Sequence, residues 1–254
     1  DRKEFTEHFS KVAEAVPSRT AKDVWKNILM TSDEENGLQL FATNGEIHMR
    51  RTISHPVKGT KVLMPAGKVA EILRELNTEK ISIDASSGKY GKLMISGASA
   101  LTSKYEMNVA DPDTFGKFPD FTLEEYFECK GQDISRLIKQ TVFATDKETD
   151  KYAHNAIQLH AQSDKITLAA TDSKRFCAAT CAATANCESK KPILVPEKAM
   201  SLVRSIIGAS EENIRFSIGK SDISFRIGST SISSQLFVGR SEERRVGKEC
   251  LRLC

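Results

Sequence analysis

The sequence predicts an α+β fold made of two copies of one domain. Three observations predict it. A short apolar strand leads through a proline into an amphipathic helix at two places, and these prolines, Pro65 and Pro196, stand 131 positions apart. Alternating strands flank both copies of the motif in the same order. A spacing of this size is too long for a solenoid repeat and fits a whole domain, so it indicates a domain duplication.

Each copy is predicted to contain a helix, a set of strands, the proline-led helix and a closing strand pair. Apolar residues three or four positions apart predict the helices, and alternation that ends in polar turns predicts the strands. The elements correspond between the copies as follows: helical faces at Phe5, Phe9, Val12 and Val16 and at Ile134, Leu137 and Ile138, strands at 37–45 and 165–173, proline-led strands and helices at 63–74 and 194–204, and strand pairs at 80–97 and 213–228.

The limits of the two domains follow from interruptions of this periodicity. Asp-Pro-Asp at 111–113 and Phe-Pro-Asp-Phe at 118–121 break the pattern between the copies. We therefore assign the first domain to residues 1–120 and the second to residues 121–240.

The last residues change character at Arg240, where alternating apolar residues give way to dense charge. Back-translated, the residues from Arg240 to Cys250 resemble one reading frame of a common sequencing adapter. Residues 241–254 are therefore interpreted as an adapter-derived, non-native tail and excluded from the fold. The alternative is a genuine basic tail that contacts DNA. Without residues 241–254 the formal net charge falls from +3 to +2, because they carry four basic and three acidic side chains.

The bulk composition is that of a globular protein. Hydrophobic residues make up 39% of the chain and charged residues 28%, which fits neither a disordered nor a fibrous sequence. No apolar run approaches the length that crosses a bilayer, so no membrane partner is expected. The start, Asp1 to Glu4, has neither an initiator Met nor a signal-peptide pattern, and we expect a cytoplasmic protein whose chain is incomplete at both ends. Because the net charge is small, attraction to a polyanion must come from how the charge is distributed.

No metal, cofactor or catalytic centre is predicted. The six cysteines are unevenly placed without a C-x-x-C pair, and Cys177, Cys181 and Cys187 lie in an Ala/Thr-rich stretch with no His nearby in sequence. The sequence contains none of the motifs of P-loop, dinucleotide-binding, zinc-protease or serine-hydrolase enzymes. The five histidines are scattered and pair with no obvious nucleophile. We therefore expect a protein that catalyses no reaction itself.

Several motifs, in order, resemble those of the bacterial DNA sliding clamp, the beta subunit of DNA polymerase III, over residues 4–240. Phe-Pro-Asp at 118–120 resembles the junction after that family's first domain. Ala-Thr-Asp-Ser-Lys-Arg-Phe at 170–176 resembles its Ala-Thr-Asp-Gly-His-Arg-Leu segment, and residues 193–203 resemble the strand and helix of its second domain. Residues 236–240 resemble the segment that in the family comes just before a second Phe-Pro-Asp. In this chain the adapter-like residues follow at that point instead. The third domain of the family is therefore expected to be missing.

The resemblance implies an architecture and a function. Each domain would have an antiparallel sheet outside and two helices lining the inner face, and three domains per subunit would close head to tail as a homodimer around DNA. The ring would be a DNA replication processivity factor, a non-catalytic accessory subunit of the holoenzyme. Its partners would be double-stranded DNA of any sequence, the DNA polymerase III catalytic subunit, the clamp loader and other proteins with clamp-binding motifs. Diffuse positive charge suits a ring that must slide, because tight binding would stop it.

The candidate DNA contacts are basic residues of the helices that lie off the apolar stripe, together with two loops. Composition alone favours an ordinary solvated helix face, and only the repeat and the resemblance favour DNA. One loop contains the basic residue Arg19. The other contains Lys147 and Lys151, which can pair with phosphates, beside Tyr152, which can stack on bases. The full set is Arg19, Lys68, Arg74, Arg136, Lys139, Lys147, Lys151, Tyr152, Lys198 and Arg204.

The resemblance also implies a hydrophobic pocket for short linear motifs of partner proteins. This chain departs from the family pattern where Ser173 and Lys174 replace Gly-His and where His154 stands in place of a common apolar residue. The rest of such a pocket belongs to the third domain. Taken alone, Thr171 to Ser173 also fits a plain hairpin turn. The pocket positions are His154, Thr171, Ser173, Lys174, Arg175 and Phe176.

Two other classes of protein compete with this interpretation. An enzyme would need a catalytic constellation, which the sequence lacks. A duplicated-domain peptide-binding module would use the pocket without encircling DNA. Ring closure around DNA is the property that separates a clamp from such a module.

We predict that resequencing the source gene across the codon for Arg240 will reveal a frame that continues into Phe-Pro-Asp and a third domain of about 120 residues. The reason is that residues 236–240 still follow the family pattern, whereas the residues after them resemble a translated sequencing adapter. A genome that encodes Ser241 to Cys254 and then a stop codon would instead favour the two-domain binding module.

Overall fold

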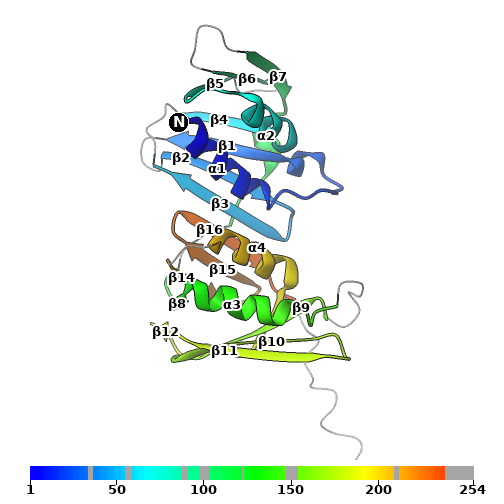
Figure 1. Cartoon of the computed structure of the whole chain (residues 1–254), viewed down its shortest axis with the longest axis vertical. Helices are drawn as coiled ribbons and strands as arrows, with labels where there is room; N and C mark the ends of the chain where they lie inside the picture. Colours follow the sequence, from blue (N-terminus) through cyan, green and yellow to red (C-terminus); the bar gives the residue numbers. More distant parts are fainter. Residues whose placement is uncertain are drawn as a thin grey trace, which may run out of the picture.

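The chain folds as two similar domains stacked along one long axis, with the N-terminal domain at the top of Figure 1. Among the described residues, no helix is long and apolar enough to span a membrane. The computed structural model describes residues 1–33, 37–54, 59–86, 91–97, 103–119, 121, 123–146, 154–208 and 212–237.

Domain 1 contains two helices, each followed by three strands. A further strand leads directly into the second helix. Its elements are α1 (Arg2–Ala13), η1 (Asp23–Lys26), β1 (Asn27–Asp33), β2 (Gly37–Thr43), β3 (Ile47–Ile53), β4 (Thr60–Pro65), α2 (Ala66–Glu75), β5 (Ile81–Ser86), β6 (Gly91–Gly97), β7 (Lys104–Val109) and η2 (Pro112–Phe115).

Domain 2 repeats this order, with a strand leading into each of its helices. Its elements are β8 (Phe127–Lys130), α3 (Gly131–Val142), β9 (Ala156–Ala161), β10 (Lys165–Thr171), β11 (Phe176–Ala182), β12 (Thr184–Ala185), β13 (Ile193–Pro196), α4 (Glu197–Ile207), β14 (Asn213–Ile218), β15 (Asp222–Ile227) and β16 (Thr230–Gln235). The predicted α+β fold with a duplicated domain is confirmed.

The two proline-led helices form where the sequence predicted them. Pro65 and Pro196 are the N-cap residues of α2 and α4, with φ of −59° and −53°. The proline ring fixes φ near these values and offers no N–H, so it suits a helix start, where the first N–H groups lack partners inside the helix.

The first predicted helix is shorter than its apolar pattern. Phe5, Phe9 and Val12 are buried on one face of α1, but α1 ends at Ala13 and Val16 lies beyond it. Val16 precedes a proline, which disfavours the helical conformation of the residue before it. The prediction that Val16 lies on the face of this helix was therefore wrong.

One antiparallel sheet runs through both domains, which the sequence analysis did not predict. Its strand order is β12-β8-β14-β15-β16-β3-β2-β1-β4. The domains meet where β16 pairs with β3, with Ile232 opposite Met49 and Thr230 opposite Arg51. Smaller sheets, β11-β10-β9-β13 and β5-β6-β7, complete the two domains.

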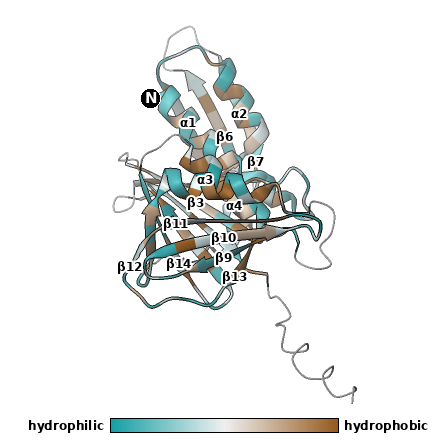
Figure 2. Cartoon of the chain, turned by 60° about the horizontal axis from the view of Figure 1, so that its bottom comes forward, coloured by the Kyte–Doolittle hydropathy of each residue, from teal (hydrophilic) through white to brown (hydrophobic). Residues whose placement is uncertain are grey.

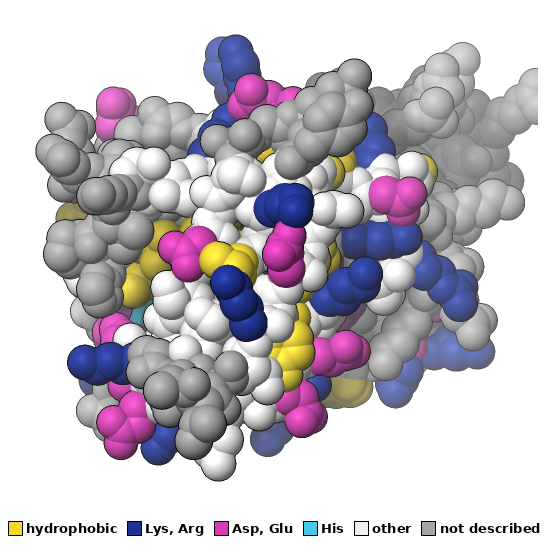
Figure 3. Space-filling model, turned by 90° about the horizontal axis from the view of Figure 1, so that it is seen from above, with side chains coloured by type: hydrophobic (Ala, Val, Ile, Leu, Met, Phe, Trp, Pro, Cys, Tyr) yellow, Lys and Arg dark blue, Asp and Glu magenta, His cyan; other side chains and the backbone are white. Residues whose placement is uncertain are grey.

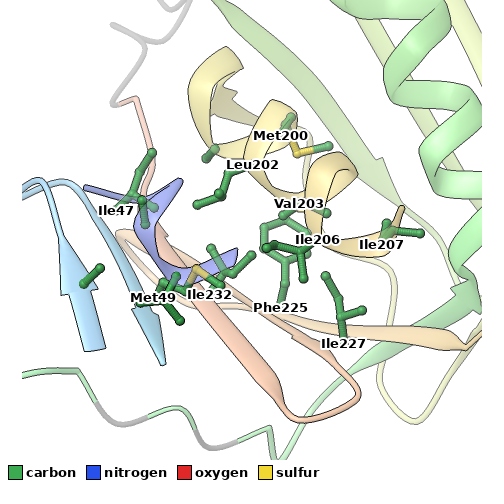
Figure 4. Close-up of a cluster of buried hydrophobic side chains, with 14 of the residues drawn as sticks. Ile47, Met49, Met200, Leu202, Val203, Ile206, Ile207, Phe225, Ile227 and Ile232 are labelled. Carbon is green, nitrogen blue, oxygen red and sulfur yellow. The ribbon is translucent and has the colours of Figure 1, made fainter. Parts of the chain in front are cut away.

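A hydrophobic cluster closes this junction beneath α4. Figure 4 shows side chains from β3, α4, β15 and β16 pointing toward one another. Met49, Val203 and Ile232 are each 0% exposed. The other labelled members of the junction cluster are Ile47, Met200, Leu202, Ile206, Ile207, Phe225 and Ile227.

A half-buried arginine joins the domains at the edge of the junction cluster. The Arg51 guanidinium donates to Thr230 Oγ1 at 2.6 Å, across the junction, and to His8 Nδ1 on α1 at 2.5 Å. Burial of the ring, and then the positive charge of Arg51, lower the pKa of His8. His8 must be neutral at Nδ1 to accept this hydrogen bond.

The helices form one layer against the sheets. α1 packs beside α2 and α3 beside α4, and all of them lie on the near side of the sheets in Figure 1. Hydropathy colouring shows the apolar sides of the helices facing the strands (Figure 2). The opposite sides of the helices are therefore left to solvent or to a ligand.

We predict that Ile232→Ala lowers the free energy of unfolding by about 2–5 kcal/mol, because it opens a cavity in the junction cluster. The single tryptophan, Trp25, lies in domain 1 and reports that domain by fluorescence in guanidinium unfolding. Its transition should move to lower denaturant, whereas the exposed Lys220→Ala should leave it unchanged. An unmoved Trp25 transition would mean that the domains unfold independently.

Candidate nucleic-acid interface and partner pocket

The helical layer exposes basic side chains from all four of its helices, and the predicted candidates lie on α2, α3 and α4. Each of these helices buries an apolar face against the sheets, as Ile134, Leu137 and Ile138 do in α3. Positions off that face are left outside, which is why the candidate cations of the helices are all exposed: Lys68 and Arg74 on α2, Arg136 and Lys139 on α3, and Lys198 and Arg204 on α4.

The charge of this layer is diluted by carboxylates. Arg136 Nη2 lies 3.1 Å from Asp133 Oδ1 one turn earlier in α3, and both side chains are partly exposed. Such surface pairs contribute little to stability, but they reduce the local positive field. Among the described residues, the other five helical cations form no ion pair within 4 Å. The layer therefore offers spaced cations rather than one dense patch.

A polar groove lies between the domains and brings two candidates to the same place. The exposed loop residue Arg19 of domain 1 and Lys198 of α4 both line it. Its volume is about 630 Å³, and Ser18, Ser201 and Ser205 line it together with the carboxylates Glu14 and Glu197. The two cations are donors for phosphate oxygens, whereas the two carboxylates reduce the positive charge of the groove.

The other loop candidates, Lys147, Lys151 and Tyr152, lie outside the described residues. Sequence reasoning passed over α1, which belongs to the same helical layer and exposes Lys3. The first helix was read for its apolar face alone, and no basic position on it was considered.

A shallow hollow on the β9–β10–β11 sheet contains part of the predicted partner pocket. His154, Thr171 and Phe176 line this hollow, which has a volume of about 190 Å³. Phe176 is 73% exposed, an unusual state for a phenylalanine of a folded domain. Its remaining lining residues, which the sequence analysis missed, are Ala156, Gln158, Ala169, Ala170 and Leu194.

The other three predicted pocket residues form the turn beside the hollow. Ser173 has a φ of 67°, in the left-handed region that glycine adopts more readily. Ser173, Lys174 and Arg175 are exposed, and the Arg175 guanidinium lies 6.0 Å from the ring centre of Phe143, which is itself 55% exposed. The turn therefore brings exposed cations next to Phe176, and one of them lies near the exposed ring of Phe143.

One carboxylate organises this turn. Asp172 Oδ1 accepts from the backbone N–H groups of Lys174 and Arg175, and Oδ2 accepts from the Arg175 guanidinium at 2.7 and 3.0 Å. These hydrogen bonds, first that of the guanidinium, lower the pKa of Asp172 to about 2. The plain-turn interpretation and the pocket interpretation are thus both compatible with this segment.

The four cysteines within the described residues are free thiols. Cys129 and Cys181 are buried, whereas Cys177 and Cys187 are half-buried. A hydrogen bond with Cys181, followed by burial, raises the pKa of the Cys129 thiol. Within the described ranges, no group of three or more His, Cys, Asp or Glu side chains is arranged to hold a metal ion.

Duplicated α+β domains, joined through one sheet and carrying their helices in a single layer, are the architecture that the family resemblance implied. Two family models match the chain: the DNA polymerase III beta subunit, N-terminal domain, over residues 1–119, and the central domain of the same subunit over residues 128–241. The chain therefore belongs to the DNA polymerase III beta subunit family, as the resemblance predicted.

Individual relatives agree with the family models. The chain is 22% identical over 244 residues to the beta sliding clamp of Staphylococcus epidermidis, covering 92% of this chain and 63% of the relative. It is 23% identical over 252 residues to that of Halalkalibacterium halodurans, covering 94% and 64%. The chain thus spans a little under two thirds of the length of these relatives.

Solved structures share the fold. A putative DNA polymerase III beta subunit from Eubacterium rectale superposes with a TM-score of 0.85 at 20% identity, over 95% of this chain and 65% of that one. The DNA polymerase sliding clamp of Bacillus subtilis gives 0.83 at 16% identity, over 98% and 67%. Similarity at this level of identity establishes the architecture.

We predict that the Asp172 carboxylate titrates near pH 2 in the folded protein, followed by NMR. An unfolded Asp titrates near 3.9, so the stability that this turn contributes is complete above about pH 4 and is lost as the pH falls toward 2. Arg175→Gln should move the Asp172 midpoint upward, because it removes the strongest hydrogen bond. A wild-type midpoint near 4 would contradict the turn geometry described here.

Proposed function

We propose that this chain is the first two domains of a sliding clamp that encircles duplex DNA and acts as a processivity factor in replication. The observation that carries the proposal is the helical layer: α2, α3 and α4 carry exposed cations at positions off their buried apolar faces, and these helices lie on one side of the sheets (Figure 1). Spaced cations attract the phosphate backbone without reading bases, because phosphates carry no sequence information directly.

The clamp would be complete only with a third domain and a second subunit, arranged head to tail as a homodimer. The length of the relatives supports this, since the chain covers about 63% of them. A closed ring retains the polymerase by topology. A polymerase that lets go of its primer end remains at high effective concentration beside it. The chain itself would catalyse nothing and would act in the cytoplasm, where the chromosome is copied.

Partner proteins would dock on the hollow beside Phe176. The DNA polymerase III catalytic subunit, the clamp loader and other clamp-motif proteins are the expected partners, each through a short segment. The exposed ring of Phe176 and the cations Lys174 and Arg175 suit a segment that combines apolar and acidic residues. Because this hollow lies on a sheet and the basic residues lie on the helices, both ligands can be bound at once.

A peptide-binding module that does not encircle DNA is the second candidate. The same exposed Phe176 and its hollow favour it, since they need no DNA to act. The two functions are separated by whether the helical layer binds duplex DNA.

We predict that the protein binds duplex DNA weakly at low salt, without sequence preference. Lys139→Glu with Lys198→Glu should flatten the slope of log affinity against log salt by about 2, because two phosphate contacts are lost. The measurement is fluorescence anisotropy of a labelled duplex over a salt series.

The matched control for this experiment has the same change in charge away from the helices. Lys165 and Lys220 are exposed beside strand ends, and Lys165→Glu with Lys220→Glu should leave the slope nearly unchanged. Equal losses from both double variants would show that net charge alone attracts DNA. No binding at low salt would sink the clamp function and leave the peptide-binding module.

A further inference from the structure

Domain 2 carries all four cysteines that the structure describes, at Cys129, Cys177, Cys181 and Cys187. Domain 1 contains no cysteine in its sequence. Its outer end, viewed in Figure 3, carries charged side chains of both signs around a few hydrophobic ones. Within the described part of the chain, an oxidant that reacts with thiols therefore acts on domain 2.

One continuous run of chain carries three of these cysteines and lies beside the strand of the fourth. The run passes from β11 into β12, which pairs antiparallel with β8 (Figure 1). Thr184 of β12 lies opposite Glu128 of β8. The same register holds beyond β12, because the Asn186 backbone N–H donates to Tyr126 O at 3.2 Å. Each step back along the run is therefore matched by one step forward along β8.

This register makes Cys129 and Cys181 neighbours. It places Ala183 opposite Cys129, and Cys181 is the next residue along the same face of the run. Exposure alternates without a break over residues 176–187, and Cys181 lies on the inward side. Cys129 is 5% exposed and Cys181 is 7% exposed, and both belong to the hydrophobic core. The two thiols are therefore diagonal neighbours in the core beneath α3, which packs on β8 and β11.

The two thiols also differ in acidity because they interact with each other. A hydrogen bond from Cys129 is the first cause that lowers the pKa of Cys181, and the same bond, followed by burial, raises the pKa of Cys129. From α3, Asp133 raises the pKa of both thiols and Arg136 lowers that of Cys181, each with a smaller effect. Cys181 therefore ionises first, and the thiolate is the nucleophilic form of cysteine.

Strand geometry excludes the other pairings of the described cysteines within one chain. A disulfide requires Cα atoms within about 7 Å of each other. Cys177 and Cys187 lie four and six residues from Cys181 along the extended run, which is about 13 and about 20 Å. In the register with β8, they lie six and four residues from the position opposite Cys129. Cys129 with Cys181 is therefore the one pair of the described cysteines that can close.

We propose that Cys129 and Cys181 form an oxidation site, at which hydrogen peroxide converts the two thiols into a disulfide that joins β8 to β11. The Cys181 thiolate attacks one peroxide oxygen, so that an S–O bond forms and the O–O bond breaks. The departing hydroxide takes up the proton that Cys181 had released and becomes water. Cys129 Sγ then attacks the sulfenic sulfur of Cys181, the S–S bond forms, and the S–O bond breaks. The hydroxide leaves with the Cys129 proton as a second water, so the thiols lose two electrons and the peroxide gains them.

The disulfide ties together the two sheets of domain 2. β8 belongs to the sheet that runs through both domains, whereas β11 belongs to the four-stranded sheet. Ala183 lies outside both β11 and β12, so the chain can adjust there to bring the sulfurs to bonding distance. The new bond closes a loop of about 50 residues, which restricts the unfolded chain and stabilises the domain. The oxidation needs neither DNA nor a partner protein, so it is independent of the proposed clamp function.

The test uses the chain with Cys250→Ser and Cys254→Ser, which retains the four described cysteines. The folded protein is treated with hydrogen peroxide, the remaining thiols are blocked with N-ethylmaleimide, and linked peptides are identified by mass spectrometry. The expected product links the peptides of Cys129 and Cys181 within one chain and is reversed by dithiothreitol. Its Tm should be higher than that of the reduced protein by about 5 °C or more.

Single variants separate the roles of the two thiols. Cys129→Ser should stop the reaction at a sulfenic acid on Cys181, which dimedone traps. Cys181→Ser should slow the loss of the Cys129 thiol by about tenfold or more, because Cys129 stays protonated. The matched control, Cys177→Ser with Cys187→Ser, removes two thiols of the same run and should leave the rate of Cys129–Cys181 linkage within about twofold of its original value.

Three results would overturn the proposal. The first is a linked product that contains Cys177 or Cys187 in place of either proposed partner. The second is a linkage between two chains whose rate rises with protein concentration. The third is survival of both Cys129 and Cys181 as thiols at a peroxide dose that oxidises the half-buried Cys177. None of these three results requires a substitution in the core, so they remain informative even where Cys129→Ser or Cys181→Ser folds poorly.

Discussion

The antiparallel pairing of β3 with β16 is the constraint on which the rest of the structure depends. Met49 lies opposite Ile232, and both side chains are 0% exposed in the junction cluster. Side chains alternate between the two faces of a strand, so a slip of one residue would place Met49 and Ile232 on opposite faces of the sheet and bring a polar neighbour of one of them into the cluster. The register therefore fixes the face that domain 2 presents relative to domain 1, and it is this relation that places all the described helices in one layer.

This arrangement divides the surface into two parts with different physical demands. The helical layer exposes cations such as Lys139 and Lys198, for which only the density of charge matters. The hollow beside Phe176 depends on shape, because its lining comes from the four strands β9, β10, β11 and β13, and the turn held by Asp172 lies beside it. Arg51 contributes to the helical layer indirectly. Its hydrogen bonds to His8 and Thr230 hold α1 and β16 at fixed positions on either side of the junction.

Local patterns in the sequence were sufficient to predict the helices and strands, but they did not predict which strands of the two domains pair with each other. The prolines Pro65 and Pro196 predicted two helix starts, because proline acts through its own φ and its missing N–H, which are local properties. The pairing of β3 with β16 joins residues about 180 positions apart, and alternation shows which face of a strand is buried without showing its partner. Val16 marks the opposite limit, where the apolar period continued past the end of the helix.

Only those residues of the candidate site that belong to a recognisable sequence motif could be predicted. His154, Thr171 and Phe176 came from the resemblance and do line one hollow. Gln158, Ala169 and Leu194 line it too, but each is an ordinary strand residue in the sequence, and only the sheet brings the three together. The basic residues of the helices were found because exposed positions follow from an amphipathic period, whereas their common layer follows from the packing of four helices on joined sheets.

Sequence identity near 20% with a TM-score of 0.85 shows how little of this architecture requires particular side chains. Cores accept many combinations of apolar residues if volume and pattern are kept, so the repeat survives as a pattern. Phosphate contact is similarly tolerant, since a lysine can move by a turn of helix and still contribute to a diffuse field. The peptide site proposed at the hollow beside Phe176 has no such freedom, because a pocket must match the shape of its ligand. In that proposal, Ser173 in a left-handed turn and the exposed ring of Phe176 are the places where the partner preference of this chain would differ from that of its relatives.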